Sequence, residues 1–115
     1  MSPNVPEQVE AERQRIVAAL GQIGFVLPGT ISTRMARCGK QTCRCRREPP
    51  QLHGPYIQWT RAVKGKTVTK VFSEAQLATY QPWFDNNRQL RELSTHLQQL
   101  SLDTIRSVEG WGAET

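Results

Sequence analysis

The feature that most constrains this chain is a cluster of cysteines: all three fall within eight positions, from Cys38 to Cys45. The surrounding segment, residues 38–54, has neither helical nor strand periodicity, and it contains the Pro49–Pro50 pair and several arginines. Such a segment cannot build a packed element on its own, so either something holds it in place or it is disordered.

The cluster and one nearby histidine form a complete set of metal ligands. Cys38, Cys43, Cys45 and His53 have the spacing C-x4-C-x-C-x7-H. Three thiolates and one imidazole suit tetrahedral Zn²⁺, and the neighbouring arginines favour the thiolate form. Gly54–Pro55 can turn the chain so that His53 faces back. We predict a structural, zinc-finger-type Zn²⁺ site, because four protein ligands leave no open position for water.

Other interpretations of the cysteines stay open. Cys43 and Cys45 are flanked by arginines, which suits the reactive thiols of a redox sensor. The fourth ligand could come from elsewhere instead of His53, including from a second subunit. An iron–sulfur cluster usually requires four thiolates, and this chain has three cysteines.

The length and composition favour a single domain with a thin core. The chain has 115 residues, of which 37% are hydrophobic and 7% aromatic. A bound metal, a partner chain or a ligand would supply stability that so small a core lacks. We therefore predict one zinc-stapled α+β domain spanning residues 1–115.

The periodicity of the remaining chain predicts its elements. A helix is expected over residues 6–23, a basic β and zinc region over 30–72, and a helical region over 74–108 with a break near Pro82. Within the middle region, Thr30 to Arg37 is typical of a strand. Lys64–Gly65 separates two further β-rich runs and predicts an antiparallel hairpin. Ser73 and Gln76 fit a capping box at the start of a long C-terminal helical region.

The last predicted helix carries a leucine seam with 3-4-3 spacing, typical of a coiled coil. The seam either packs on the first helix of its own chain or forms a homodimer or partner interface. Its residues are Leu90, Leu93, Leu97 and Leu100. His96 lies in the same helix, and we expect no role for it.

Positive charge is concentrated in the centre of the sequence. The chain has a net charge of +5, but the window from Arg34 to Lys70 holds ten basic residues opposed by Glu48 alone. Such a stripe is typical of a polyanion binder, and nucleic acid, with DNA favoured over RNA, is the expected partner. A solvated surface is the plainer alternative. The ten are Arg34, Arg37, Lys40, Arg44, Arg46, Arg47, Arg61, Lys64, Lys66 and Lys70.

Aromatic residues beside the basic hairpin allow two interpretations. Tyr56 and Trp59 could stack on bases or pack beneath the sheet, and packing is favoured for Trp59. Trp83 and Phe84, at the start of the last predicted helix, are expected in the core.

Catalysis finds no support in the sequence. No paired carboxylates, no nucleophile triad and no glycine-rich phosphate loop occur, so we expect neither an enzyme nor a small-molecule substrate. No apolar run approaches the length of a membrane span, and the N-terminus lacks the regions of a signal peptide. We therefore expect a cytoplasmic protein without a membrane partner.

Two motifs resemble a known family. The Cys38-Gly39-Lys40-x-x-Cys43-x-Cys45 and His53-Gly54-Pro55-Tyr56 motifs, with the basic hairpin and C-terminal helix, are similar to a family of small, uncharacterised bacterial proteins. The resemblance covers about residues 24–100. It implies a domain of unknown function found near recombinases and other mobile elements, which suits a DNA-binding accessory factor. The alternatives are a zinc-stabilised adaptor that oligomerises through its last helix, and a cysteine redox sensor.

Overall fold

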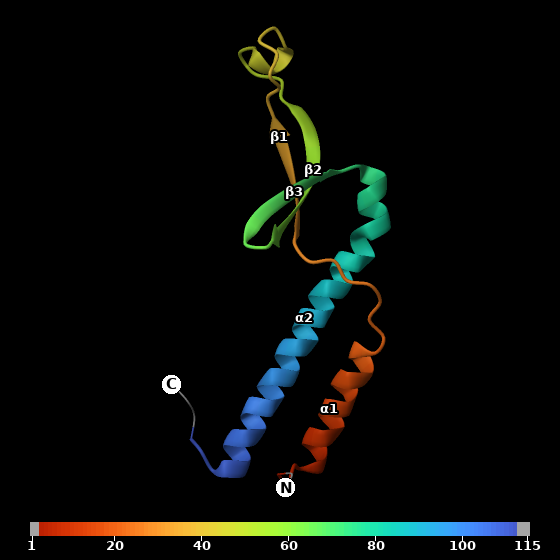
Figure 1. Ribbon diagram of the computed structural model, residues 1–115, viewed down its shortest axis with the longest axis vertical. Helices are drawn as coiled ribbons and strands as arrows, with labels where there is room; N and C mark the ends of the chain where they lie inside the picture. Colours follow the sequence, from red (N-terminus) through yellow and green to blue (C-terminus); the bar gives the residue numbers. More distant parts are fainter. Residues whose placement is uncertain (1–2, 113–115) are drawn as a thin grey trace. The chain divides into compact units, whose positions relative to one another are not determined.

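The protein has an α+β fold, as predicted. The computed structural model describes residues 3–112. Its elements in chain order are helix α1 (Glu7–Leu20), strand β1 (Thr30–Ala36), a 3-10 turn η1 (Arg44–Arg46), strands β2 (His53–Val63) and β3 (Lys66–Phe72), and helix α2 (Glu74–Glu109) (Figure 1). No helix among the described residues is long and apolar enough to cross a membrane.

The chain divides into two compact units. The sheet unit is Leu27–Phe84, and the helical unit comprises the residues up to Val26 and those from Asp85 onward. That one domain spans residues 1–115 stays a prediction.

The sheet unit contains a three-stranded antiparallel sheet in the order β1-β2-β3. Lys64 and Gly65 form the tight turn between β2 and β3, and both have positive φ angles, 50° and 80°. This is the two-residue hairpin geometry whose twist matches that of the strands. At the other end of β2, the residue opposite His53 is Ala36, the last residue of β1. The segment between these two residues is the cysteine loop.

One face of the sheet packs against the first turns of α2. The Trp59 ring lies 5.7 Å from Phe72 and 5.8 Å from Phe84, measured between ring centroids, and Phe72 lies 6.3 Å from Tyr80. Phe84 is buried, and the indole N–H of Trp59 donates to the carbonyl oxygen of Pro28 at 2.8 Å. Trp59 and Phe84 therefore pack in the small aromatic core, as the sequence analysis favoured.

Helix α2 begins as predicted but does not break. The backbone N–H of Gln76 donates to Ser73 Oγ, and the backbone N–H of Ser73 donates to Gln76 Oε1, which completes the capping box. Contrary to the prediction, the helix continues through Pro82 to Glu109. A proline inside a helix costs about 3 kcal/mol. Aromatic contacts of Tyr80 and Phe84, on either side of Pro82, hold the helix in place.

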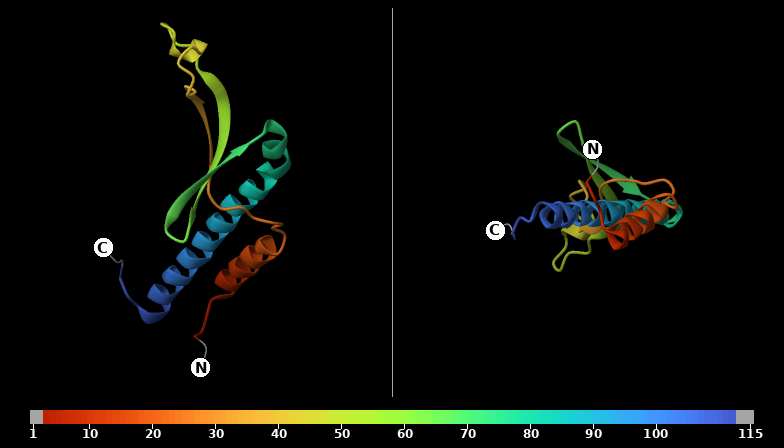
Figure 2. Two further views of the ribbon diagram at one scale, coloured as in Figure 1. Left: turned by 45° about the horizontal axis from the view of Figure 1, so that its top comes forward. Right: turned by 90° about the horizontal axis from the view of Figure 1, so that it is seen from below.

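In the helical unit, α1 lies alongside the second half of α2 (Figures 1 and 2). Ile16 is 2% exposed. The side-chain amide of Asn86 donates to the carbonyl oxygen of Phe25. The Oε1 atom of Glu12 in α1 lies 3.4 Å from Nε2 of His96 in α2. The leucine seam thus lies in α2, the helix that α1 of the same chain runs alongside. His96, for which we expected no role, meets a carboxylate of α1.

Candidate metal centre

The predicted metal ligands lie at the tip of the β1–β2 hairpin, where the cysteine loop connects the two strands (Figure 2). Cys38 follows the end of β1 by two residues, and His53 is the first residue of β2. The strand register shifts between Arg34 and Ala36, so β1 is irregular just before the loop. The pairing of two strands thereby brings together the first and the last ligand.

Local hydrogen bonds position the two middle ligands. The backbone N–H of Cys43 donates to the carbonyl oxygen of Lys40 at 3.4 Å, and the N–H of Arg46 donates to that of Cys43 at 2.9 Å. These turns lead into η1, whose central residue is Cys45. Cys45 is 0% exposed, although both its neighbours are exposed arginines. The loop therefore buries the Cys45 side chain, while Cys38 and Cys43 are half-buried.

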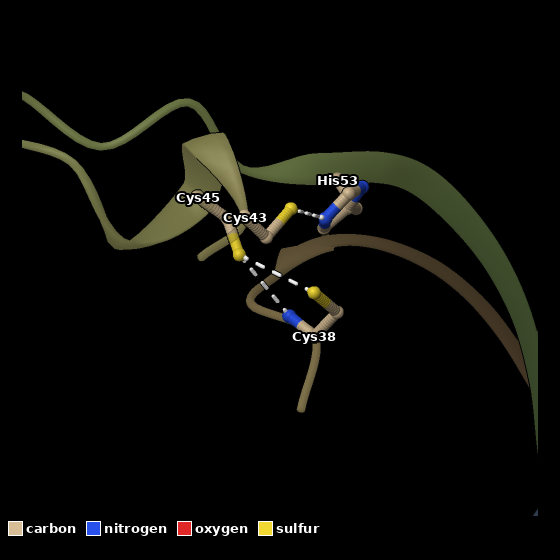
Figure 3. Close-up of side chains that lie close together, drawn as sticks. All are labelled: Cys38, Cys43, Cys45 and His53. Atoms are coloured by element: carbon tan, nitrogen blue, oxygen red, sulfur yellow. Dashed lines mark hydrogen bonds between the residues drawn. The ribbon is translucent and has the colours of Figure 1, made fainter. Parts of the chain in front are cut away.

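The four donor atoms converge in one place (Figure 3). The three Sγ atoms and a ring nitrogen of His53 all lie within 4.8 Å of one another. Cys38 Sγ is 3.6 Å from Cys45 Sγ, and Cys43 Sγ is 2.9 Å from His53 Nε2. With Zn–S bonds of about 2.3 Å, two thiolates of a tetrahedral site lie about 3.8 Å apart. The distance between the Cys38 and Cys45 thiols is therefore close to that of two thiolates in a tetrahedral metal site.

The surroundings of the cluster act differently on its thiols. The backbone N–H of Cys38 donates to Cys45 Sγ at 3.3 Å. Hydrogen bonds from the Cys45 backbone N–H and from the Cys38 thiol lower the pKa of Cys43 to about 6, against the effect of burial. For Cys38, a backbone hydrogen bond from Lys40 lowers the pKa, but the neighbouring thiols and burial outweigh it, and the pKa is raised. The surroundings therefore favour the thiolate form of Cys43 and the neutral thiol of Cys38.

Arg46 has a structural contact in this loop. Its guanidinium donates to the carbonyl oxygen of Cys38 at 2.7 Å, across the cluster from its own backbone. Arg44 and Arg47, on either side, are exposed. The N–H of Gln51 donates to the Arg44 carbonyl oxygen at 3.2 Å, which ties the later part of the loop to η1.

The ten predicted nucleic-acid contacts lie in four places within the sheet unit. The register puts Arg61, Lys66 and Lys70 on the face of Trp59, which we call the covered face. Arg34 projects from the opposite face, here the open face. The cysteine loop carries Arg37, Lys40, Arg44, Arg46 and Arg47, and Lys64 is in the hairpin turn.

Arg61 differs from the other nine. Its guanidinium carbon lies 4.2 Å from the centre of the Trp59 ring, a cation–π contact. Its Nη1 atom is buried and has no hydrogen-bond partner within residues 3–112. The other nine basic residues are exposed. No sequence signal distinguished Arg61, because the contact depends on how the sheet packs.

The helical unit has an apolar groove that the sequence analysis found only in part. Leu97 and Leu100 of the predicted seam line it, whereas Leu90 and Leu93 are half-buried outside it. Its volume is about 630 Å³. Val5 and Val9, and Ile105 and Val108 near the end of α2, also line the groove. Ile105 and Val108 continue the apolar stripe of the last helix beyond the leucine seam, as their helical spacing indicates.

Comparison with known proteins gives a family but no relative of known structure. Neither the curated proteins nor the solved structures contain a match to the chain. The sequence model of a domain of unknown function, DUF6788, matches residues 6–82. The match covers α1, the whole sheet, the four candidate ligands and the start of α2, and so it begins and ends earlier than the predicted stretch of about 24–100. On this match the chain belongs to the DUF6788 family.

Proposed function

We propose that this protein binds nucleic acid through a basic loop that a single structural Zn²⁺ ion holds in shape. Cys38, Cys43, Cys45 and His53 are the zinc ligands. Three soft thiolates with one imidazole select zinc over hard cations such as Mg²⁺. The convergence of four donor atoms within 4.8 Å supports a metal over a redox role, which needs only two thiols.

One observation carries the nucleic-acid part of the proposal: the positive charge of the sheet unit is not neutralised. This unit holds ten basic residues and two acidic ones, Glu48 and Glu74. Within residues 3–112, none of the ten forms an ion pair. In the helical unit, four of the five arginines pair with a carboxylate, namely Arg13, Arg15, Arg88 and Arg106.

Unpaired positive charge on a fixed loop suits the phosphate backbone. Arg44 and Arg47 present exposed guanidinium groups on either side of buried Cys45. Guanidinium forms bidentate hydrogen bonds to phosphate, and neutralised phosphates release counterions. A metal that fixes the loop would reduce the ordering cost of these contacts. DNA is the favoured partner, in line with the resemblance described above.

Two measurements test this function. Native mass spectrometry of protein purified without chelators or metal-affinity tags should show one zinc per chain; folded protein without metal would contradict the site. Fluorescence anisotropy with labelled oligonucleotides should show affinity that falls with salt. Arg44→Ala with Arg47→Ala should reduce the duplex salt slope by about 2, because each phosphate contact contributes about 0.9.

A matched variant separates local from global charge. Arg88→Ala with Arg91→Ala removes the same charge from exposed positions of α2, outside the basic loop. It should leave the salt slope near the wild-type value. Equal effects of the two double variants would show that net charge alone governs binding. No affinity for any oligonucleotide at low salt would refute nucleic-acid binding.

The groove of the helical unit favours a second candidate, self-association. Ile105 and Val108 are 45% and 40% exposed at its edge, more than a finished two-helix core would leave. Glu10 and Arg13, which also line the groove, pair with each other within α1. A second copy related by a twofold axis can cover the apolar residues. We propose a homodimer through this groove.

Sedimentation velocity over a range of concentrations tests the dimer. Ile105→Glu with Val108→Glu should give a monomer. Val17→Glu, at an apolar α1 position that is 46% exposed and outside the groove, should leave the dimer intact. Wild-type protein that stays monomeric at all concentrations would refute this candidate.

A further inference from the structure

The open face of the sheet has an unusual composition for a surface exposed to water. Its β1 and β3 side chains are all exposed, and none of the three strands contains Asp or Glu. Solvated faces usually mix both signs of charge, whereas this one offers hydroxyl and amide groups with one cation. The face consists of Thr30, Ser32, Arg34, Tyr56, Gln58, Thr60, Ala62, Thr67, Thr69 and Val71.

An aromatic ring and a guanidinium lie side by side on this face. Arg34 of β1 is directly opposite Tyr56 of β2 in the register, and both side chains are exposed. On the next strand Val71 pairs with Gln58 and is 57% exposed. Cross-strand partners have their Cβ atoms about 5 Å apart, so the ring and the cation form one patch. Neither residue belongs to the aromatic core, which lies on the covered face.

This patch continues into the basic loop along the chain. Arg34 is four residues before Cys38, and Tyr56 is three residues after His53, so both strands lead from the patch to the metal ligands. The register shift after Arg34 marks the boundary between them. A strand of nucleic acid on this face could therefore place bases on the sheet and phosphates on Arg37 or Arg44.

We propose that the open face binds single-stranded nucleic acid, with one base stacked on Tyr56 and Arg34 beside it. This inference rests on the proposed function and specifies its substrate. A flat sheet surface accepts unstacked bases, whereas the duplex major groove admits a helix or a two-stranded ribbon. Stacking is tolerant of sequence, and the hydroxyl groups of Thr69 and Ser32 add polar contacts. DNA and RNA single strands share this chemistry.

The test uses the full chain with its metal and fluorescently labelled oligo(dT), oligo(U) and a DNA hairpin duplex, all at one salt concentration. Tyr56→Ala should weaken binding of the single strands about tenfold to a hundredfold, the usual effect of removing a stacking ring. Tyr56→Phe keeps the ring and should retain wild-type affinity. Arg34→Lys keeps the charge but not the planar group, so its affinity for single strands should lie between those of Tyr56→Ala and Tyr56→Phe.

A second measurement guards against misfolding, since Tyr56 is close to His53. Metal content and circular dichroism of each variant report on the fold. In the wild-type protein, ultraviolet crosslinking to oligo(dT) followed by peptide mapping should identify the peptide that contains Tyr56. Comparison of oligo(dT) with oligo(U) shows which kind of strand is preferred.

The outcomes separate the two proposals. If single strands and duplex bind equally and Tyr56→Ala changes neither, or if crosslinks form only in the cysteine loop, the open face is not the site and the proposed function stands. If no oligonucleotide binds at low salt, the proposed function itself fails. Selective loss of single-strand binding in Tyr56→Ala, with duplex binding unchanged, supports the open face.

Discussion

Removal of the proposed Zn²⁺ should weaken the pairing of β1 with β2, because the first candidate ligand, Cys38, closely follows β1 and the last, His53, begins β2. A cross-link from Cys38 to His53 encloses 16 residues. For a loop of that size, the chain-entropy estimate of stabilisation is about 3 kcal/mol. Since 1.4 kcal/mol corresponds to a factor of ten, backbone amides of β1 should lose protection about 150-fold.

Hydrogen–deuterium exchange with mass spectrometry measures this loss peptide by peptide. Protein treated with a chelator is compared with untreated protein at one pH and temperature. Peptides from β1 should exchange faster, while peptides from α1 serve as an internal control, because the helical unit contains none of the ligands. His53→Gln should reproduce the effect without a chelator, whereas His96→Gln, which replaces the only other histidine, should not.

Two results would refute this reasoning. Unchanged exchange in β1 after metal removal would show that the strand register holds the hairpin without help. An equal loss of protection in β1 and α1 would mean that the metal supports the whole chain, not the hairpin. In the second case the entropy of the enclosed loop would be the wrong explanation.

Two other predictions concern backbone conformation and pH. Gly29 has a φ of +98°, and a Cβ there would lie 2.5 Å from the carbonyl oxygen of Thr60, so Gly29→Ala should lower the stability of the sheet unit by more than about 1–3 kcal/mol. Gly65 also has a positive φ, but a Cβ there would meet no other atom, so Gly65→Ala should lower the stability less in the same denaturant titration. Hydrogen bonds from Arg13 and Arg15 lower the pKa values of Glu10 and Glu12. The stability that the two carboxylates contribute is therefore present above pH 4.5, the ordinary pKa of Glu, and is lost as the pH falls through the lowered pKa values of the folded state. The Tm should therefore fall less steeply with acidification in Glu10→Gln with Glu12→Gln; an unchanged slope would contradict this.

The sequence was sufficient to predict the features that depend on local chemistry. The four donor residues are close together in the chain, so residue type and spacing were enough to group Cys38 with His53. The capping box at Ser73 and the tight turn at Lys64–Gly65 are likewise decided by neighbouring residues. The same is true of the α+β class, since helical and strand periodicities occupy separate stretches.

The features that the sequence did not reveal depend on tertiary contacts. Pro82 predicts a break in an isolated helix, but aromatic packing on both sides outweighs the lost hydrogen bond. Arg61 has the same local pattern as Lys66 and Lys70, yet it stacks on Trp59 and loses contact with solvent at one nitrogen. That Arg34 and Tyr56 share one face of the sheet could be seen only from the strand register, which shifts between Arg34 and Ala36.

The basic character of the cysteine loop has a further consequence for the lifetime of the chain. Lys40, Arg44, Arg46 and Arg47 lie between the first and the last candidate ligand, and each is a cleavage site for trypsin-like proteases. In the folded loop, the 3-10 turn η1 around buried Cys45 keeps Arg44 and Arg46 from the extended conformation that a protease active site accepts. Loss of the metal would release these two sites together. Proteolysis would then remove the metal-free chains selectively, and the amount of intact protein would follow the supply of zinc.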